Sequence, residues 1–151
     1  MVSGSDLDRR EPGVAGRRYN PRMQIFRGEA SPARDADTNT FVGQAHVTHL
    51  ASADAGVPVV VYHVDFEDGG RTNWHIHSGA QWLLVVAGRV RVQVWGEPHQ
   101  EVAAGDAVVI APGEKHWHGA APGGRGVHLA VNVNFKTDWL EPVSDEQYRG
   151  I

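Results

Sequence analysis

Short apolar runs separated by turn residues dominate the chain from residue 23 onward. Five of these runs are rich in valine and aromatic residues and favour β-strands, at 57–66, 81–87, 89–95, 106–111 and 125–135. Gly88 separates two of them and is expected to form a turn. The spacing predicts an all-β domain, either a β-sandwich or a small barrel. A helical piece is expected only at 139–150, where Ser144 and Gln147 have the spacing of a capping box.

The first 22 residues lack this pattern. They are polar, carry both charges and contain no apolar stretch of the kind found in a signal peptide. We therefore expect an N-terminal arm over 1–22, flexible or in contact with a partner, followed by a single domain over 23–151. No apolar run approaches the roughly 18 residues that span a bilayer. The chain has no cysteine, and its net charge of -4 provides no basic surface for nucleic acid. A cytoplasmic location is the default expectation.

The nine histidines carry most of the candidate chemistry. His75 and His77 are two residues apart, so on a strand they project from the same face, and Gln81 has the same parity. His116 and His118 repeat the H-x-H pattern about forty residues later. Two such pairs on separate β-segments are typical of a divalent metal site. The isolated histidines are expected to be satisfied surface or core residues, and these are His46, His49, His63 and His99.

The same residues resemble the two conserved motifs of the cupin superfamily. Four residues match the first motif, namely Gly69, His75, His77 and Gly88, and Gln81 stands where glutamate is usual. Three match the second motif, namely Gly105, Gly113 and His116, whereas Ala111 and Ala120 depart from it. The resemblance implies a double-stranded β-helix of two antiparallel sheets, with one metal ion inside the barrel.

A narrower resemblance extends from about residue 69 to the C-terminus. The segments "APGEKHWHGAAP" and "DWLEPVSDEQYR" are similar to small bacterial cupins that include manganese-dependent hydroxynitrile lyases and carboxymuconolactone-decarboxylase-like cupins. This resemblance implies a divalent metal ion, manganese first and iron, zinc or nickel as alternatives. It implies the metal ligands His75, His77, Gln81 and His116. It places Thr72, His118 and His128 around the substrate, with His118 as the leading candidate for proton transfer.

Two positions depart from these lyase-like cupins. Asn132 replaces a glutamine, and Tyr62 replaces a small residue on an inward strand position. Both changes alter the pocket and therefore bear on the substrate. We expect His128 and Asn132 to line the cavity, together with Tyr62, Val64 and Phe66 as substrate contacts.

This arrangement inverts the usual patterning of the strand at 125–135. Its polar face would line the cavity, and its apolar face would turn outward and need a cover. A second sheet or a second subunit would supply that cover, so we expect a homodimer or higher homo-oligomer. The five tryptophans are expected to be packing residues.

Three imidazoles and an amide are neutral ligands, so they leave the charge of a divalent ion uncompensated. Such an ion favours Lewis-acid chemistry on an oxyanion or cyanide over oxidation. We therefore expect an enzyme that acts on a small organic molecule, most concretely a C–C bond lyase of hydroxynitrile lyase type. A polyketide cyclase or dioxygenase, and a non-catalytic small-molecule-binding cupin, are the alternatives.

Overall fold

The computed structural model describes residues 22–151, so the arm expected over 1–22 lies outside the described residues except for Arg22. This part of the chain is mostly β-structure, as expected. Its strands are β1 (Arg34–Asp35), β2 (Phe41–Val42), β3 (Ala45–Asp54), β4 (Pro58–Phe66), β5 (Arg71–Thr72), β6 (His75–His77), β7 (Gln81–Val94), β8 (Gln100–Ala103), β9 (Ala107–Ile110), β10 (His116–Ala120), β11 (Gly126–Val133) and β12 (Thr137–Trp139). Two short helices complete it, a 3-10 turn η1 (Gly28–Ala30) and α1 (Asp145–Arg149).

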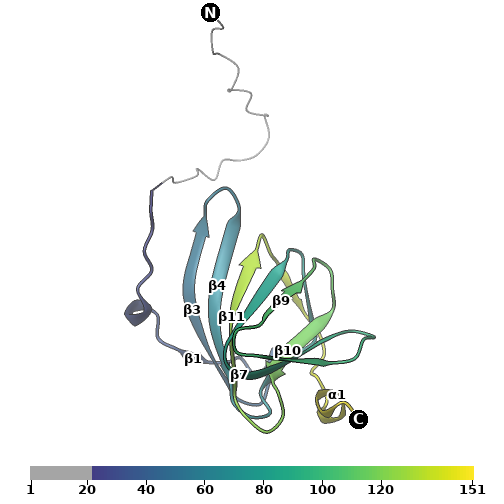
Figure 1. Ribbon diagram of the computed structural model, residues 1–151. Helices are drawn as coiled ribbons and strands as arrows, with labels where there is room; N and C mark the ends of the chain where they lie inside the picture. Colours follow the sequence, from purple (N-terminus) through teal and green to yellow (C-terminus); the bar gives the residue numbers. More distant parts are fainter. Residues whose placement is uncertain (1–21) are drawn as a thin grey trace, which may run out of the picture.

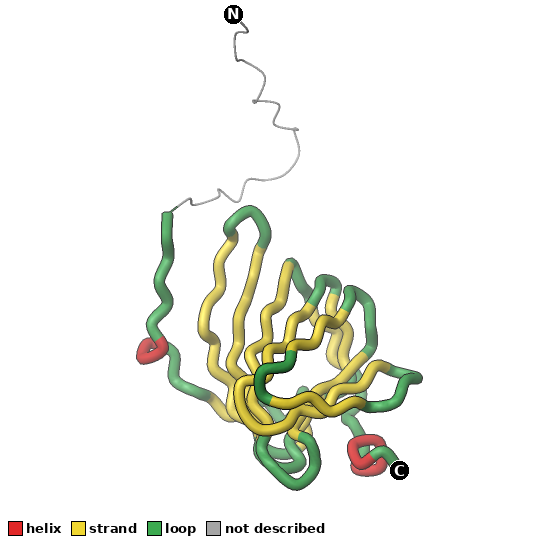
Figure 2. Tube along the Cα trace, viewed as in Figure 1, coloured by secondary structure: helices red, strands yellow, loops and turns green. Residues whose placement is uncertain are grey.

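The strands form one antiparallel sheet that curls on itself (Figures 1 and 2). Its main path runs β1-β3-β4-β11-β7-β10-β5-β2, and the remaining strands join at β7, β10 and β6. The first half of β7 pairs with β11 and β9, whereas its second half pairs with β10 and β8. The long strand β7 therefore belongs to both walls of the barrel and encloses the interior.

Gly88 is the point at which β7 changes walls. We expected a turn there between two strands, but the strand continues through it. Gly88 has a positive φ of 63°, and a Cβ at this position would lie 2.0 Å from the carbonyl oxygen of Arg125. Only glycine combines this backbone conformation with so close an approach, so the residue bends the strand instead of ending it.

The inner face of β11 is polar, as the cupin resemblance implies. His128, Ala130 and Asn132 are all buried, with exposed fractions of 0%, 4% and 3%. The alternate residues Leu129, Val131 and Val133 are only partly buried. The inversion expected from the sequence is therefore confirmed. It leaves several apolar side chains on the outside of the same wall: Trp82, Leu84, Val86 and Val109 are 38–54% exposed.

The C-terminal segment packs across the opposite wall. Tyr148 of α1 joins Trp74, Trp117 and Val143 in a buried apolar cluster. The capping box at Ser144 and Gln147 is present, with both reciprocal hydrogen bonds formed. The helix covers Asp145–Arg149 and is shorter than the 139–150 expected: Trp139 belongs to a strand that pairs with β6, and the helix begins only after the cap at Ser144.

Other elements depart from the sequence pattern. The strand β3 was not expected, because "AHVTHLASAD" contains few strand-forming residues; pairing along nearly all of β4 supports it. Trp74 and Trp117 are packing residues as predicted, whereas Trp82, Trp95 and Trp139 are 46%, 52% and 41% exposed. Within residues 22–151, no helix has the length and apolar character needed to cross a membrane.

Candidate metal centre

A cavity of about 310 Å³ lies inside the barrel. Eight of the expected site residues line it: Tyr62, Val64, Thr72, His75, His77, Gln81, His118 and Asn132. They come from β4, β5, β6, β7, β10 and β11, so strands far apart in the sequence converge on one space. His116 does not line the cavity but contacts it through Gln81, whose Oε1 lies 3.1 Å from His116 Nε2.

Strand pairing brings the histidines together. His116 of β10 lies directly opposite His75 of β6, and their ring centroids are 4.2 Å apart. The His77 ring centroid lies 4.9 Å from that of His75 and 5.4 Å from that of His116. Three imidazoles from two strands therefore surround one point.

The outer nitrogen of each of these rings has a partner. His75 Nδ1 lies 2.8 Å from the carbonyl oxygen of Asn73, and His116 Nδ1 lies 2.8 Å from that of Glu114. A carbonyl only accepts, so Nδ1 carries the proton in both rings and Nε2 presents a lone pair. His77 Nδ1 is 2.8 Å from Thr137 Oγ1. Metal-ligating histidines are typically oriented in this way through the nitrogen that does not bind.

The inner nitrogen of His77 has no hydrogen-bond partner among residues 22–151, although it is buried. A buried polar atom without a partner is costly unless something else satisfies it. A divalent cation would satisfy it, together with the inward lone pairs of His75 and His116. The donor set of this cavity therefore fits a metal ion.

Gln81 presents its oxygen to the same point. Its Nε2 donates to Asn132 Oδ1 at 2.8 Å, and both side chains are buried. This bond leaves Gln81 Oε1 on the side of the histidines, where an amide oxygen can bind a hard or borderline cation. Asn132 therefore determines which end of the amide faces inward.

His118 extends the cluster. The ligand nitrogens of His75, His116 and His118 lie within 4.8 Å of one another, so these three buried histidines can hold a metal ion. This set differs from the expected one, because it contains His118 in place of His77. His118 Nδ1 is already 2.9 Å from His128 Nε2, and His118 Nε2 has no partner among the described residues. His118 thus has one free nitrogen, which can serve either as a ligand or as a base.

All five buried histidines are held neutral. Burial lowers the pKa of His75 and His118 well below the ordinary value, and the neighbouring imidazoles lower it further. Burial, followed by the nearby His116, lowers the pKa of His77 to about 4. Burial lowers the pKa of His116 and takes that of His128 to about 3. Each ring therefore offers a lone pair at neutral pH, and none contributes a positive charge.

Two expected cavity residues occupy a deeper layer. Phe66 is fully buried and does not line the cavity; its ring packs against His128 and His118, with centroids 5.4 and 6.1 Å apart. His128 lies behind His118 and also does not line the cavity. In the strand register Phe66 lies opposite Gly126 and Ala45, at the end of β4 beyond Val64. Phe66 supports the histidine pair and has no access to a substrate.

The sequence pattern missed several residues of the cavity wall. Trp139 lines the cavity, with its ring centroid 4.7 Å from that of His75, and Thr137 holds His77. Phe41 completes the wall from β2. Only the parity of 137 and 139 on a strand would have indicated that these two share a face, and Trp139 was expected to begin a helical piece.

The chain matches known proteins across this same region. Residues 62–132 match the profile of a family described as Cupin domain. An (R)-mandelonitrile lyase from Granulicella tundricola is 39% identical over 130 residues, which cover 84% of this chain and 99% of that protein. The chain belongs to the cupin family. The curled antiparallel sheet, the histidine-lined cavity inside it and the short C-terminal helix are thus those of a small cupin.

Two solved structures of other proteins are similar to this cupin. A cupin-like protein from Thermotoga maritima is 38% identical, covers 77% of this chain and 90% of its own, and superposes with a TM-score of 0.73. A polyketide cyclase from Streptomyces resistomycificus is 20% identical, with coverage of 84% and 91% and a TM-score of 0.64. At that identity the second likeness concerns the fold alone.

Proposed function

We propose that this cupin is a metal-dependent lyase that cleaves an α-hydroxynitrile into a carbonyl compound and hydrogen cyanide. The proposal rests on the converging donors of the cavity, above all the unpartnered inner nitrogen of buried His77. The 39% identity to a protein named (R)-mandelonitrile lyase, over nearly its whole length, supports the reaction class. The substrate is a small organic molecule, in keeping with a cavity of about 310 Å³.

We propose that His75, His77, Gln81 and His116 hold the metal ion. Manganese is our first choice, and iron, zinc or nickel suit the same donors. When bound, the metal supplies Lewis-acid stabilisation of negative charge on oxygen or cyanide. All four ligands are neutral, so none of them reduces the positive charge that an anion would meet in the cavity.

His118 is the proposed base. The reaction removes the hydroxyl proton of the substrate, forms the C=O bond and expels cyanide with the electron pair of the C–C bond. His118 Nε2 is buried and has no hydrogen-bond partner among residues 22–151, and the lowered pKa of His118 keeps it neutral and able to accept this proton. The expelled cyanide then takes the proton back from His118 and leaves as hydrogen cyanide.

Neighbouring residues set the position and tautomer of His118. If Nε2 is to accept a proton, Nδ1 must carry one and donate it to His128 Nε2, 2.9 Å away. Thr72 Oγ1 accepts a hydrogen bond from the backbone N–H of His118 at 3.2 Å. That bond leaves the hydroxyl proton of Thr72 for an oxygen in the cavity. Tyr62 and Val64 form the wall against which the organic group would pack.

Cyanide release from mandelonitrile tests the reaction. We expect release that depends on added Mn²⁺ and disappears after chelation, and we expect His75→Ala to lose both the metal and the activity. His63→Ala is the matched control, because His63 alternates with Tyr62 and Val64 and faces away from the cavity. Wild-type protein that binds Mn²⁺ yet releases no cyanide would contradict the proposed reaction.

His118→Ala separates the two possible ligand sets. We expect it to retain the metal and lose turnover, because the proposed ligands remain. A variant that loses the metal as completely as His75→Ala would instead place His118 in the coordination sphere, with His75 and His116. His77→Ala should lose the metal if His77 is a ligand and retain it if His118 is the ligand instead. Metal analysis of the two variants therefore decides between the two ligand sets.

We also propose that a second copy of the chain covers the outer apolar face. Trp82, Leu84 and Val86 of β7 lie beside Val109 of β9, and all four are substantially exposed. An uncovered patch of this kind is unfavourable in water. Light scattering should give the mass of a dimer or larger oligomer, and Trp82→Lys should shift it to that of the monomer. A wild-type monomer at high concentration would contradict this assembly.

A further inference from the structure

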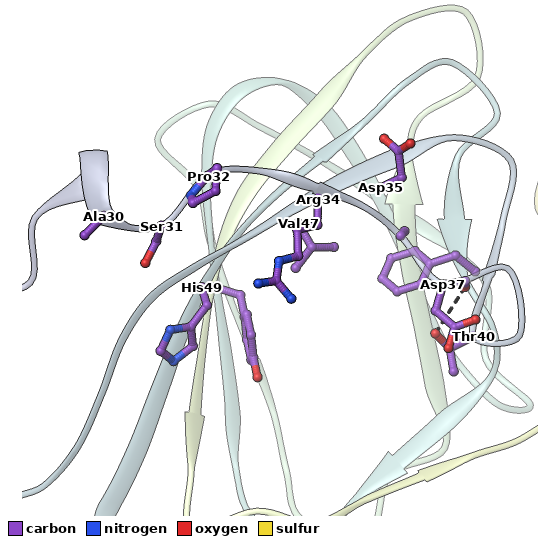
Figure 3. Close-up of a pocket in the computed structure, with 12 residues that line it drawn as sticks. Ala30, Ser31, Pro32, Arg34, Asp35, Asp37, Thr40, Val47 and His49 are labelled. Atoms are coloured by element: carbon purple, nitrogen blue, oxygen red, sulfur yellow. Dashed lines mark hydrogen bonds between the residues drawn. The ribbon is translucent and has the colours of Figure 1, made fainter.

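A second chamber adjoins the metal cavity. It has a volume of about 550 Å³ and lies between the segment at residues 30–41 and the strands β3 and β4 (Figure 3). Three residues, Phe41, Val47 and Tyr62, line both spaces. The chamber therefore shares a wall with the cavity, and a ligand that extends from one space to the other would pass these three side chains.

Arg34 is exposed on the edge strand β1, and strand pairing places it in a row of the inner face of the barrel wall. It lies opposite Val47 on β3, Val47 lies opposite Val64 on β4, and Val64 lies opposite His128 on β11. Residues in such a row share one face of the sheet. Figure 3 shows the Arg34 guanidinium directed into the chamber on the side of His49, whereas Asp35 points away from it.

The charge of Arg34 has no counterion in the part of the chain that the structure describes. No hydrogen bond or ion pair joins its guanidinium to any other residue of 22–151. The two carboxylates of the chamber are occupied elsewhere: Asp35 Oδ1 contacts His46 at 3.1 Å, and Asp37 Oδ1 accepts the N–H of Asn39 at 2.8 Å. Arg71, Arg89, Arg91 and Arg125 each contact a carboxylate, whereas Arg27 and Arg149, like Arg34, have no such contact among residues 22–151.

We infer that Arg34 binds a carboxylate at the far end of the substrate, whose reacting carbon lies in the metal cavity. A guanidinium pairs with a carboxylate through two parallel hydrogen bonds, which makes it the natural partner for this group. Two strand spacings, about 10 Å between Cα atoms, separate Arg34 from Val64, a residue of this row that lines the metal cavity. The Arg34 side chain spans part of this distance and the ligand the rest, so the substrate class is an elongated aryl or alkyl carboxylate.

Tyr62 stands between the two spaces. Its ring packs edge-on against His49, with centroids 5.6 Å apart, and it lines both the cavity and the chamber. An aromatic group of the substrate passing from the metal to Arg34 would lie along this ring. A mandelonitrile-sized molecule would fill the inner cavity only and leave Arg34 without a partner.

Binding of a matched pair of probes tests the role of Arg34 independently of turnover. The probes are 3-phenylpropionate and its neutral analogue 3-phenylpropanamide, titrated calorimetrically into the full chain with and without Mn²⁺. We expect the carboxylate to bind roughly tenfold tighter than the amide, as for a charge-assisted hydrogen bond. Arg34→Gln should abolish this preference and Arg34→Lys should retain part of it. Arg27→Gln, on the same segment but outside the chamber, should leave it unchanged.

Two outcomes would overturn the inference. One is a carboxylate preference that survives in Arg34→Gln. If that surviving preference disappears when the metal is removed, the carboxylate binds the metal and not Arg34. The other is no preference in the wild type. The inference rests on the proposed function only for the position of the reacting carbon. Absence of cyanide release with an intact, Arg34-dependent preference would refute the lyase and leave the carboxylate site standing. Metal-dependent cyanide release, with a carboxylate preference that Arg34→Gln does not change, would support the lyase and refute the carboxylate site.

Discussion

Asn132 controls the orientation of a proposed metal ligand without touching the metal itself. Its Oδ1 accepts the hydrogen bond from Gln81 Nε2 at 2.8 Å, and the two side chains are only 3% and 4% exposed. Asn132→Ala removes this acceptor and leaves a buried amide N–H₂ group without a partner. That loss destabilises the fold by about 1–3 kcal/mol. It also frees the Gln81 amide to turn its nitrogen toward the histidines.

The larger effect should fall on metal binding. Loss of a residue that orients a metal ligand typically lowers affinity about 10- to 100-fold. Calorimetric titration of the chelated protein with Mn²⁺ measures this directly, and urea unfolding of the same metal-free sample measures the stability. Both measurements are independent of the substrate.

Asn132→Asp is the matched control. It keeps an oxygen acceptor at the same position, so Gln81 should stay oriented and Mn²⁺ should bind at least as well as in the wild type. The reasoning would be refuted if Asn132→Ala bound Mn²⁺ with wild-type affinity. Equal losses in the alanine and aspartate variants would also refute it, because the acceptor would then not be the relevant feature.

Three further predictions concern charge, pH and packing. Gln81→Glu should raise Mn²⁺ affinity and lower cyanide release, since it cancels one positive charge; unchanged affinity in a titration would mean that Gln81 does not contact the metal. The depressed pKa values of His128 and His77, about 3 and about 4, mean that the unfolded chain binds more protons than the folded chain as the pH falls toward and below 6.5. Stability of the metal-free protein is therefore full only well above pH 6.5 and should fall between pH 7 and pH 5, by about 2 kcal/mol from His128 alone, as measured by urea unfolding. A flat profile would contradict this. Gly79→Ala should cost about 1–3 kcal/mol, because its Cβ would lie 1.9 Å from a backbone oxygen of β11, whereas Gly124→Ala has open space and should be neutral in the same assay.

Much of the candidate site could be predicted from local pattern. The two H-x-H pairs and Gln81 have the spacing of ligands on alternating strands, and the structure gathers them around one cavity. The polar inner face of β11 followed from the same alternation once the cupin motifs were recognised. Ser144 and Gln147 form the expected capping box because capping depends on residues only three apart.

Other features have no local signature. The strand β3 exists because β4 offers it a pairing edge, and Gly88 bends a strand that its neighbours on both walls keep continuous. The depth of Phe66 depends on the register of β4 with β3 and β11. Thr137 reaches His77 through pairing of β12 with β6, sixty residues apart in the chain.

The amino-acid order was sufficient for the fold class, the cupin membership and most of the residues that line the cavity, because alternation, turn chemistry and motif spacing act over a few residues. The tertiary structure alone decided which nitrogens face inward, which side chains lie a layer deeper, and that Arg34 lines the neighbouring chamber with no counterion among residues 22–151. These properties depend on the register between strands that are distant in sequence, and that register follows from packing the whole sheet around one interior.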